Sequence, residues 1–317
     1  MKLIELFNFR KEELPVPEAR RAVIALGGGG ARGLAHLGAL QVIGESGIQT
    51  ERIVGVSIGS LVGAMCAVTP NIYQVQAAAI EFLHSSVFLE KFISVAGPAS
   101  KLSKREEDSP SLSWYASTMA RVRKTVSNSR RLRRAITGPA LMHDSLLRDA
   151  IEHLVPDIDI RETTVPLSIV TADLISGQRI VLESGSLRQA VLASTAIPGF
   201  FPPVKWNDCF LCDIGVLDSL PTQVARSYAS DLVIGVDVGA DSTAIAAPGT
   251  AVEVMMRMDE IGERIMRRTA IGFADAVIRP EVGHRPWFDF SDPETLIAEG
   301  KIAASRILAA LQATQAV

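Results

Sequence analysis

Glycine is concentrated in one short stretch of this 317-residue chain. Eleven of its 24 glycines lie between Gly27 and Gly63, about a ninth of the sequence. Glycine is the residue that accepts tight turns and the close approach of another group, and it loses the most backbone entropy on folding. So high a local density indicates a segment that turns sharply or lets a ligand approach its backbone, and we expect a functional site there.

The composition restricts the class of protein. Hydrophobic residues make up 48% of the chain and its mean hydropathy is +0.24, which provides for a large core and excludes intrinsic disorder over most of the sequence. The 32 basic and 35 acidic residues give a net charge of −3, so nucleic acid is not an expected partner.

Cysteine content and hydropathy indicate a cytoplasmic protein. Three cysteines cannot form a disulfide framework, and the N-terminal residues include acids where a signal peptide needs an uninterrupted apolar region. The strongly apolar segment at 53–68 is 16 residues long, short of the roughly 20 that a membrane-spanning helix needs. A buried strand followed by a helix explains it better.

Short apolar runs alternate with longer helical patterns, which predicts an α/β fold with a mostly parallel central sheet and helices on both faces. We expect one domain over residues 22–317, with an N-terminal extension at 1–21 and a helical C-terminal segment at about 251–317. Strands are expected at residues 22–26, 52–56, 166–172, 179–183, 209–212 and 232–236. Helices are expected at residues 34–44, 57–68 and 72–88.

An insertion at about 96–143 differs from the rest of the chain. Glycine and proline punctuate it, and its second half carries many bases and no acid. One interpretation is a solvated, mobile surface insertion. The other is a lid or docking surface for anionic lipid headgroups, since each clustered base near a membrane contributes about 1 kcal/mol. Both stay open for the seven bases, which are Arg121, Arg123, Lys124, Arg130, Arg131, Arg133 and Arg134.

The first motif is AVIALGGGGARG at residues 22–33, a strand that runs into glycines and then a helix. Several N–H groups and a helix N-terminus would surround one point there, which favours bound negative charge. The glycines also match G-x-G-x-x-G, but the next strand ends in Ser57 rather than in the acid that a dinucleotide site needs. The segment does not match a P-loop either, because no Lys-Ser or Lys-Thr pair follows the glycines.

The second motif is G-x-S-x-G at Gly55, Ser57 and Gly59, between an apolar strand and an apolar helix. A nucleophilic serine on a sharp strand-to-helix turn needs small neighbours, which the two glycines supply. The alternative is a serine that only caps the helix. The anion cradle that ends 24 residues upstream favours the nucleophile.

A nucleophilic serine needs a base. His36 lies one turn into the helix after the glycines, where a packed histidine is expected, and the other histidines lack a motif. Asp213 ends the apolar run at 209–212, and active-site residues gather at strand ends of parallel sheets. Asp213 is therefore preferred over Asp208 and Asp218, although a turn or cap role would also suit an aspartate.

These motifs in this order resemble the patatin-like phospholipase family, in particular its short bacterial members. GGGGARG, GVSIGS, LASTAIPGFFPPV and CDIGVLDSLP carry the resemblance, which covers about residues 22–312. It implies a three-layer α/β sandwich with a nucleophile elbow and a Ser-Asp dyad without histidine. Ser57 would be the nucleophile and Asp213 its base. The oxyanion motif of the family falls on Gly28, Gly29, Gly30 and Arg32.

The chain departs from the family pattern after the aspartate. The family has Asp-Gly-Gly or Asp-Gly-Ala, whereas Ile214 follows Asp213 here. If this position required a positive φ, a β-branched residue would be strained. Ile214 would then shift Asp213 and make the dyad less efficient, unless the strand tolerates isoleucine there.

The resemblance implies a serine-dependent lipid acyl hydrolase, without metal or cofactor, that acts on phospholipids, lysophospholipids or other acyl esters, with peripheral membrane contact. A transacylase and a lipid- or partner-binding protein with little turnover are the alternatives, and homo-oligomerisation is left open. Two further patterns have structural explanations. The C-x-x-C pair at 209–212 is expected to be buried in a strand, and the methionines at 255–266 to serve core or oligomer packing.

Overall fold

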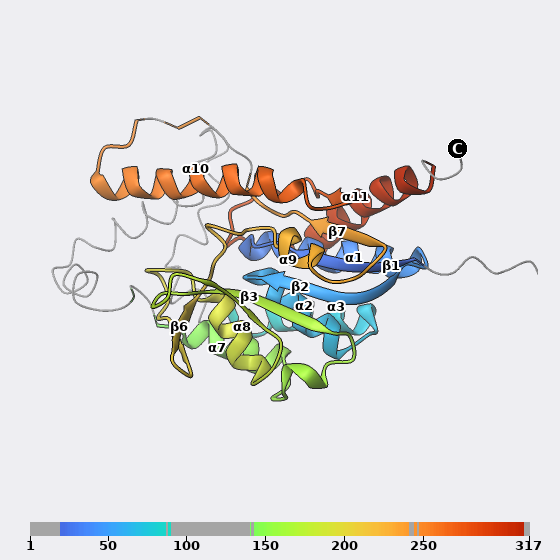
Figure 1. Cartoon of the computed structure of the whole chain (residues 1–317), viewed down its shortest axis with the longest axis horizontal. Helices are drawn as coiled ribbons and strands as arrows, with labels where there is room; N and C mark the ends of the chain where they lie inside the picture. The colour runs from blue at the N-terminus through green and yellow to red at the C-terminus, as the bar shows by residue number, and fades with distance from the viewer. Residues whose placement is uncertain are drawn as a thin grey trace, which may run out of the picture.

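The computed structural model describes residues 20–86, 88–89, 140, 143–240, 244–245 and 247–313 (Figure 1). These residues form one eight-stranded sheet in the order β5-β6-β3-β2-β1-β7-β8, and β4 pairs with β3 outside this path. The strands are β1 (Arg21–Leu26), β2 (Gln49–Val56), β3 (Leu167–Asp173), β4 (Arg179–Leu182), β5 (Val204–Trp206), β6 (Cys209–Cys212), β7 (Leu232–Val236) and β8 (Ala276–Ile278).

The sheet is parallel in its centre and antiparallel at one end. β3, β2, β1, β7 and β8 pair in parallel, whereas β4 and β6 pair antiparallel with β3, and β5 with β6. All six predicted strands are confirmed. β5 and β8 were not expected, because three residues are too few to show a periodicity.

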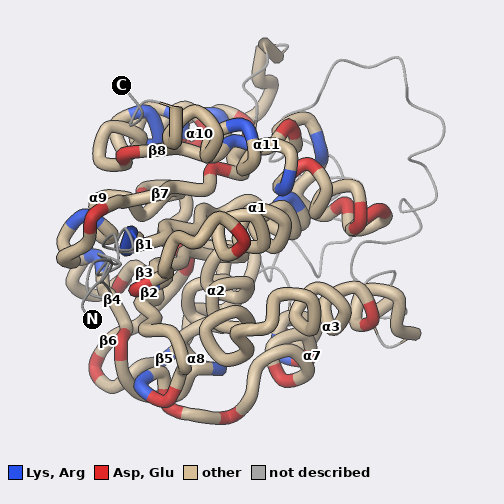
Figure 2. The backbone as a smooth tube through the Cα atoms, turned by 90° about the vertical axis from the view of Figure 1, so that its right-hand side faces the viewer, with Lys and Arg blue, Asp and Glu red and all other residues tan. Residues whose placement is uncertain are grey.

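Helices cover both faces of this sheet, as the α/β pattern predicts. Figure 2 shows α1, α2 and α3 on one side of the strands and α9 on the other. β1 is buried on both faces, with Ile24 in the larger apolar cluster and Val23 in the smaller one, which explains its continuous apolar sequence. The helices are α1 (Ala35–Glu45), α2 (Ile58–Val68), α3 (Ile72–His84), α7 (Ser145–Leu154), α8 (Leu187–Thr195), α9 (Thr222–Arg226), α10 (Ala251–Ile271) and α11 (Pro293–Ala313).

The C-terminal helix α11 packs backbone to backbone on α1. A Cβ atom at Gly38 would collide with the carbonyl of Ile297, and one at Gly300 with the carbonyl of Ala35. Only glycine allows two helices to approach so closely. Gly38 and Gly300 therefore allow the direct contact between α1 and α11.

The predictions for cysteine and methionine hold only in part. Cys212 is buried in β6, and burial raises the pKa of its thiol to about 11, but Cys209 is partly exposed. On α10, Met256 is buried, whereas Met255 and Met258 are more than half exposed. Core packing is therefore wrong for Met255 and Met258, whereas the alternative of oligomer packing stays a prediction.

Two predicted segments fall outside the described residues. They are the N-terminal extension up to residue 19 and nearly all of the 96–143 insertion, including its seven bases Arg121, Arg123, Lys124, Arg130, Arg131, Arg133 and Arg134. Within the part of the chain that is described, no helix has both the length and the apolar composition to cross a membrane.

Candidate active site

Ser57 lies between the end of β2 and the start of α2, in the strand–turn–helix arrangement that its motif predicts. Its φ of 54° and ψ of −128° are unusual for a residue with a side chain. Among the described residues other than glycine, only Ser57 and Asn207 have a positive φ. Backbone strain of this kind costs on the order of 1–3 kcal/mol and is concentrated at functional sites.

The flanking glycines allow the turn around Ser57. A Cβ atom at Gly55 would lie 2.5 Å from the carbonyl oxygen of Gly59. One at Gly59 would collide with the carbonyl of Leu26 and lie 2.8 Å from that of Gly27. Larger residues at either position would therefore push α2 away from the sheet.

Ser194 holds the Ser57 turn from the neighbouring helix α8. Its hydroxyl accepts the Ser57 N–H at 2.9 Å and donates to the carbonyl of Val170 at 2.8 Å. Ser194 is completely buried. Its contribution was not predicted, because Ser57 and Ser194 are 137 residues apart and no pattern in the sequence connects them.

Asp213 lies directly after β6, next to Ser57. The Gly215 N–H donates to Oδ1 of Asp213 at 2.7 Å. Burial raises the pKa of Asp213 to about 6, and the nearby Ser57 hydroxyl and the Gly215 N–H oppose the rise. The structure therefore brings together the two residues predicted as nucleophile and base, with the carboxyl group in a proton-accepting range near neutral pH.

Ile214 is not strained. Its φ is not positive, and its side chain is buried in the smaller apolar cluster. The glycine requirement lies one position later, because a Cβ atom at Gly215 would lie 2.9 Å from Oδ1 of Asp213. The departure from Asp-Gly-Gly therefore leaves the Asp213 turn intact.

Asp218, which follows the turn after β6, forms an ion pair with Arg179. Oδ2 of Asp218 lies 3.2 Å from Nη1 of Arg179. Burial raises the pKa of Asp218 to about 6, and Arg179 opposes the rise. Asp218 is thus paired for a structural role, while Asp208 lies in the exposed turn between β5 and β6.

The glycine loop passes over Ser57 before the short 3₁₀ helix η1 (Gly30–Leu34). A Cβ atom at Gly28 would lie 3.3 Å from Cβ of Ser57, so the loop and the serine are in contact. The Gly28 N–H donates to the carbonyl of Ser219 at 2.9 Å. Within the described residues, no acceptor takes the N–H groups of Gly29 and Gly30.

Arg32 is buried under the loop. Its Nε donates to the carbonyl of Val238 at 2.8 Å and its Nη1 to that of Arg285 at 2.9 Å. Both contacts connect η1 to segments that follow β7 and β8. They indicate that Arg32 fixes the shape of the loop.

His36 is fully buried, as expected for a packed histidine. Its Nε2 donates to the carbonyl of Gly27 at 2.8 Å, and burial lowers its pKa to about 4. His36 is therefore neutral near pH 7 and supports the start of the loop.

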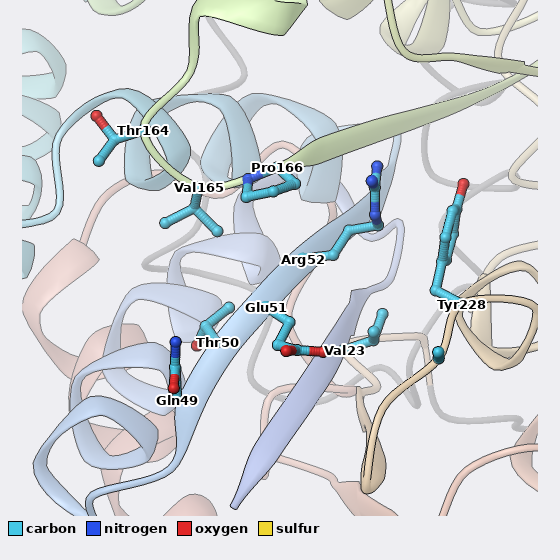
Figure 3. A pocket seen from close by; sticks show the side chains of 10 residues that line it. Val23, Gln49, Thr50, Glu51, Arg52, Thr164, Val165, Pro166 and Tyr228 are labelled. Atoms are coloured by element: carbon cyan, nitrogen blue, oxygen red, sulfur yellow. The ribbon is translucent and has the colours of Figure 1, made fainter. Parts of the chain in front are cut away.

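A pocket of about 500 Å³ opens at the opposite end of β2 (Figure 3). Glu183 accepts hydrogen bonds there from Arg52, Ser168 and Tyr228, each at 2.8 Å. The Arg52 guanidinium also lies 4.3 Å from the centre of the Tyr228 ring. Burial raises the pKa of Glu183, but the three donors together hold it below its ordinary value.

Comparisons with known proteins give one family. A model described as patatin-like phospholipase matches residues 24–226. An uncharacterized NTE family protein of Mycobacterium tuberculosis is 28% identical over 241 residues, 75% of this chain and 55% of that protein. Patatin-like phospholipase domain-containing protein 6 of Homo sapiens is 27% identical over 230 residues, 71% of this chain and 14% of that protein.

Among solved structures, the crystal structure of VipD from Legionella pneumophila aligns over 93% of this chain and 67% of VipD. Its TM-score is 0.48 and its sequence identity 17%. The chain thus spans about half the length of the mycobacterial relative and a small part of the human one.

Proposed function

Because this chain belongs to the patatin-like phospholipase family, we propose that it is a serine-dependent lipid acyl hydrolase with Ser57 as nucleophile and Asp213 as base. The observation that carries the proposal is the position of the strained Ser57 beside the buried carboxyl group of Asp213, whose pKa of about 6 lies near neutral pH. A general base is most effective when its pKa is close to that pH.

The reaction proceeds in two halves. Asp213 takes the hydroxyl proton of Ser57 as Oγ attacks the ester carbonyl, and the tetrahedral intermediate collapses when the alcohol leaves with that proton. Water then attacks the acyl-serine, giving a proton to Asp213, and the carboxylic acid leaves as Ser57 recovers its hydroxyl.

The N–H groups of Gly29 and Gly30 are the donors that we assign to the oxyanion. They have no acceptor in the described part of the chain, whereas the Gly28 N–H and the Arg32 guanidinium already have protein partners. Removing one oxyanion donor typically costs about 10²- to 10³-fold in rate.

A small apolar cluster lies beside Asp213 and supports the proposal of an acyl substrate. The Asp213 N–H donates to the carbonyl of Ala196 at 2.9 Å, which holds it against the 197–201 segment. Phe200 and Met256 are buried there, and Ile197, Phe201 and Val216 pack against them. Phospholipids, lysophospholipids and other long acyl esters are therefore the proposed substrates.

Labelling with a fluorophosphonate tests the assignment of the nucleophile. We expect the wild type to be labelled and to hydrolyse p-nitrophenyl acyl esters, and Ser57→Ala to do neither. Ser46→Ala is the matched control, because Ser46 donates to the carbonyl of Ile43 at the end of α1. An unlabelled, folded wild type would contradict the proposal and favour a lipid-binding protein. Product analysis with an added acceptor alcohol separates hydrolysis from transacylation.

A further inference from the structure

An ion pair lies buried between α10 and the end of β7. Nη1 of Arg267 is 3.4 Å from Oδ1 of Asp237, and the two residues are 5% and 2% exposed. Burying a charge is costly unless it is paired and hydrogen-bonded. Neither residue has a part in the dyad.

The pair fixes the backbone that follows β7. Arg267 Nη2 donates to the carbonyl of Ala240 at 2.9 Å, and Asp237 Oδ1 accepts the Gly239 N–H at 3.0 Å. A Cβ atom at Gly239 would occupy the place of the Arg267 guanidinium. On its other side, Asp237 Oδ2 lies 2.8 Å from Nη2 of Arg279. The 237–240 segment is therefore held from two sides by charged groups.

This segment is also the floor of the glycine loop. The Val238 carbonyl accepts from Arg32 Nε at 2.8 Å, and a Cβ atom at Gly29 would lie 2.7 Å from the same oxygen. Two residues earlier along each segment, the Gly27 N–H donates to the carbonyl of Val236 at 3.1 Å. A shift of the 237–240 segment would therefore move Gly29 relative to Ser57.

We propose that Arg267 and Asp237 are positioning residues that hold Gly29 and Gly30 at the distance from Ser57 that the oxyanion requires. The inference rests on the proposed function of the loop. It assigns α10 a direct part in the geometry of the site, because Arg267 is a residue of that helix. The pair acts through Val238 and does not touch the substrate.

Three variants and one control test this inference. We expect Arg267→Met to lower kcat for a p-nitrophenyl ester on the order of 10²-fold, since a displacement of about 1 Å far from the chemistry can have that effect. KM should not change, because the loss concerns only the transition state. Arg267→Lys should recover part of kcat. The control is Arg226→Met, which removes an arginine from a surface pair with Asp275 at 2.8 Å and should keep the wild-type kcat.

Fluorophosphonate labelling rates and thermal unfolding complete the experiment. The labelling rate should fall with kcat in Arg267→Met under conditions where the variant is folded. If that variant does not fold, Asp237→Asn and Arg267→Lys provide the same comparison. A folded variant with wild-type kcat, or an equal loss in Arg226→Met, would overturn the inference while the labelled wild type still supports the hydrolase. An unlabelled wild type would instead overturn the proposed function.

Discussion

A carboxyl group lies near each end of β2, and the two groups differ in burial, in hydrogen-bond partners and in the direction of their pKa shift. At the carboxyl end, Asp213 receives a hydroxyl and one N–H group, and burial raises its pKa to about 6. At the amino end, burial acts in the same direction on Glu183, but two hydroxyls and the Arg52 guanidinium hold its pKa below the ordinary value. Asp213 is almost completely buried whereas the Glu183 side chain is 46% exposed, so the depth of burial and the partners of each acid together decide its pKa.

This difference distinguishes a carboxyl group that can take part in catalysis from one that stabilises the fold. The pKa of Glu183 is held below its ordinary value, and its carboxylate accepts hydrogen bonds from Arg52, Ser168 and Tyr228. Asp213 has no cation among its pKa-shifting partners and can take up a proton near neutral pH. Perturbed acids of the second kind are candidates for acid–base catalysis.

The largest expected effect is the loss of activity in Asp213→Asn. An amide cannot take the Ser57 proton, so kcat for an acyl ester should fall on the order of 10⁴-fold, as happens when the acid of a serine triad is made an amide. Glu183→Gln is the matched variant at the other end of β2 and should keep kcat close to wild type. Equal losses in both variants would show that the two ends do not differ in function.

The next effect concerns the glycine loop. Gly29→Ala would place a Cβ atom 2.7 Å from the Val238 carbonyl oxygen, so the loop must shift and kcat should fall about 10²- to 10³-fold. Gly44→Ala is the control, because a Cβ atom in that α1 position meets nothing within 4 Å. It should keep kcat and stabilise the helix by about 1 kcal/mol. An active, folded Gly29→Ala would contradict the assigned donor geometry.

The pH dependence of kcat/KM is a smaller and more specific effect. Because the Asp213 carboxylate must be unprotonated to act as base, activity should decrease as the pH falls through about 6, approaching tenfold per unit below that value. Asp218 has a raised pKa of about 6 as well, so the profile of Asp218→Asn should keep the wild-type inflection. If the inflection disappears in that variant, it does not belong to Asp213.

The sequence predicted the elements of the site better than the contacts that hold them. Apolar runs located β2 and β6, and local motifs located Ser57 and Asp213 at their ends. The role of Ser194 could not be predicted, because its bond to Ser57 joins residues 137 positions apart. Likewise, the strain anticipated at Ile214 is absent, because the close approach to the carboxyl group falls at Gly215. Tertiary packing decides the backbone geometry of a single turn and the contacts between distant residues. Short sequence patterns do not show either.

The smallest expected effect is a difference in stability with opposite signs at the two ends of β2. Folding raises the pKa of Asp213, so its charge destabilises the native state above about pH 6, and the penalty disappears as the carboxyl group is protonated. Asp213→Asn should therefore raise Tm at pH 7, and this advantage should be smaller at pH 5 and disappear only near the ordinary pKa of 3.8.

Folding lowers the pKa of Glu183, so its charge stabilises the native state at pH 7 and less so as the pH falls. Glu183→Gln should thus lower Tm at pH 7. The free energy of unfolding should fall by less than about 1 kcal/mol, because the side chain is 46% exposed. Thermal unfolding of both variants at pH 7 and pH 5 measures the two signs. A lower Tm for Asp213→Asn at pH 7 would mean that the hydrogen bonds of the Asp213 carboxylate stabilise the fold by more than its burial destabilises it. Asp213 would then have a structural role, as Glu183 does.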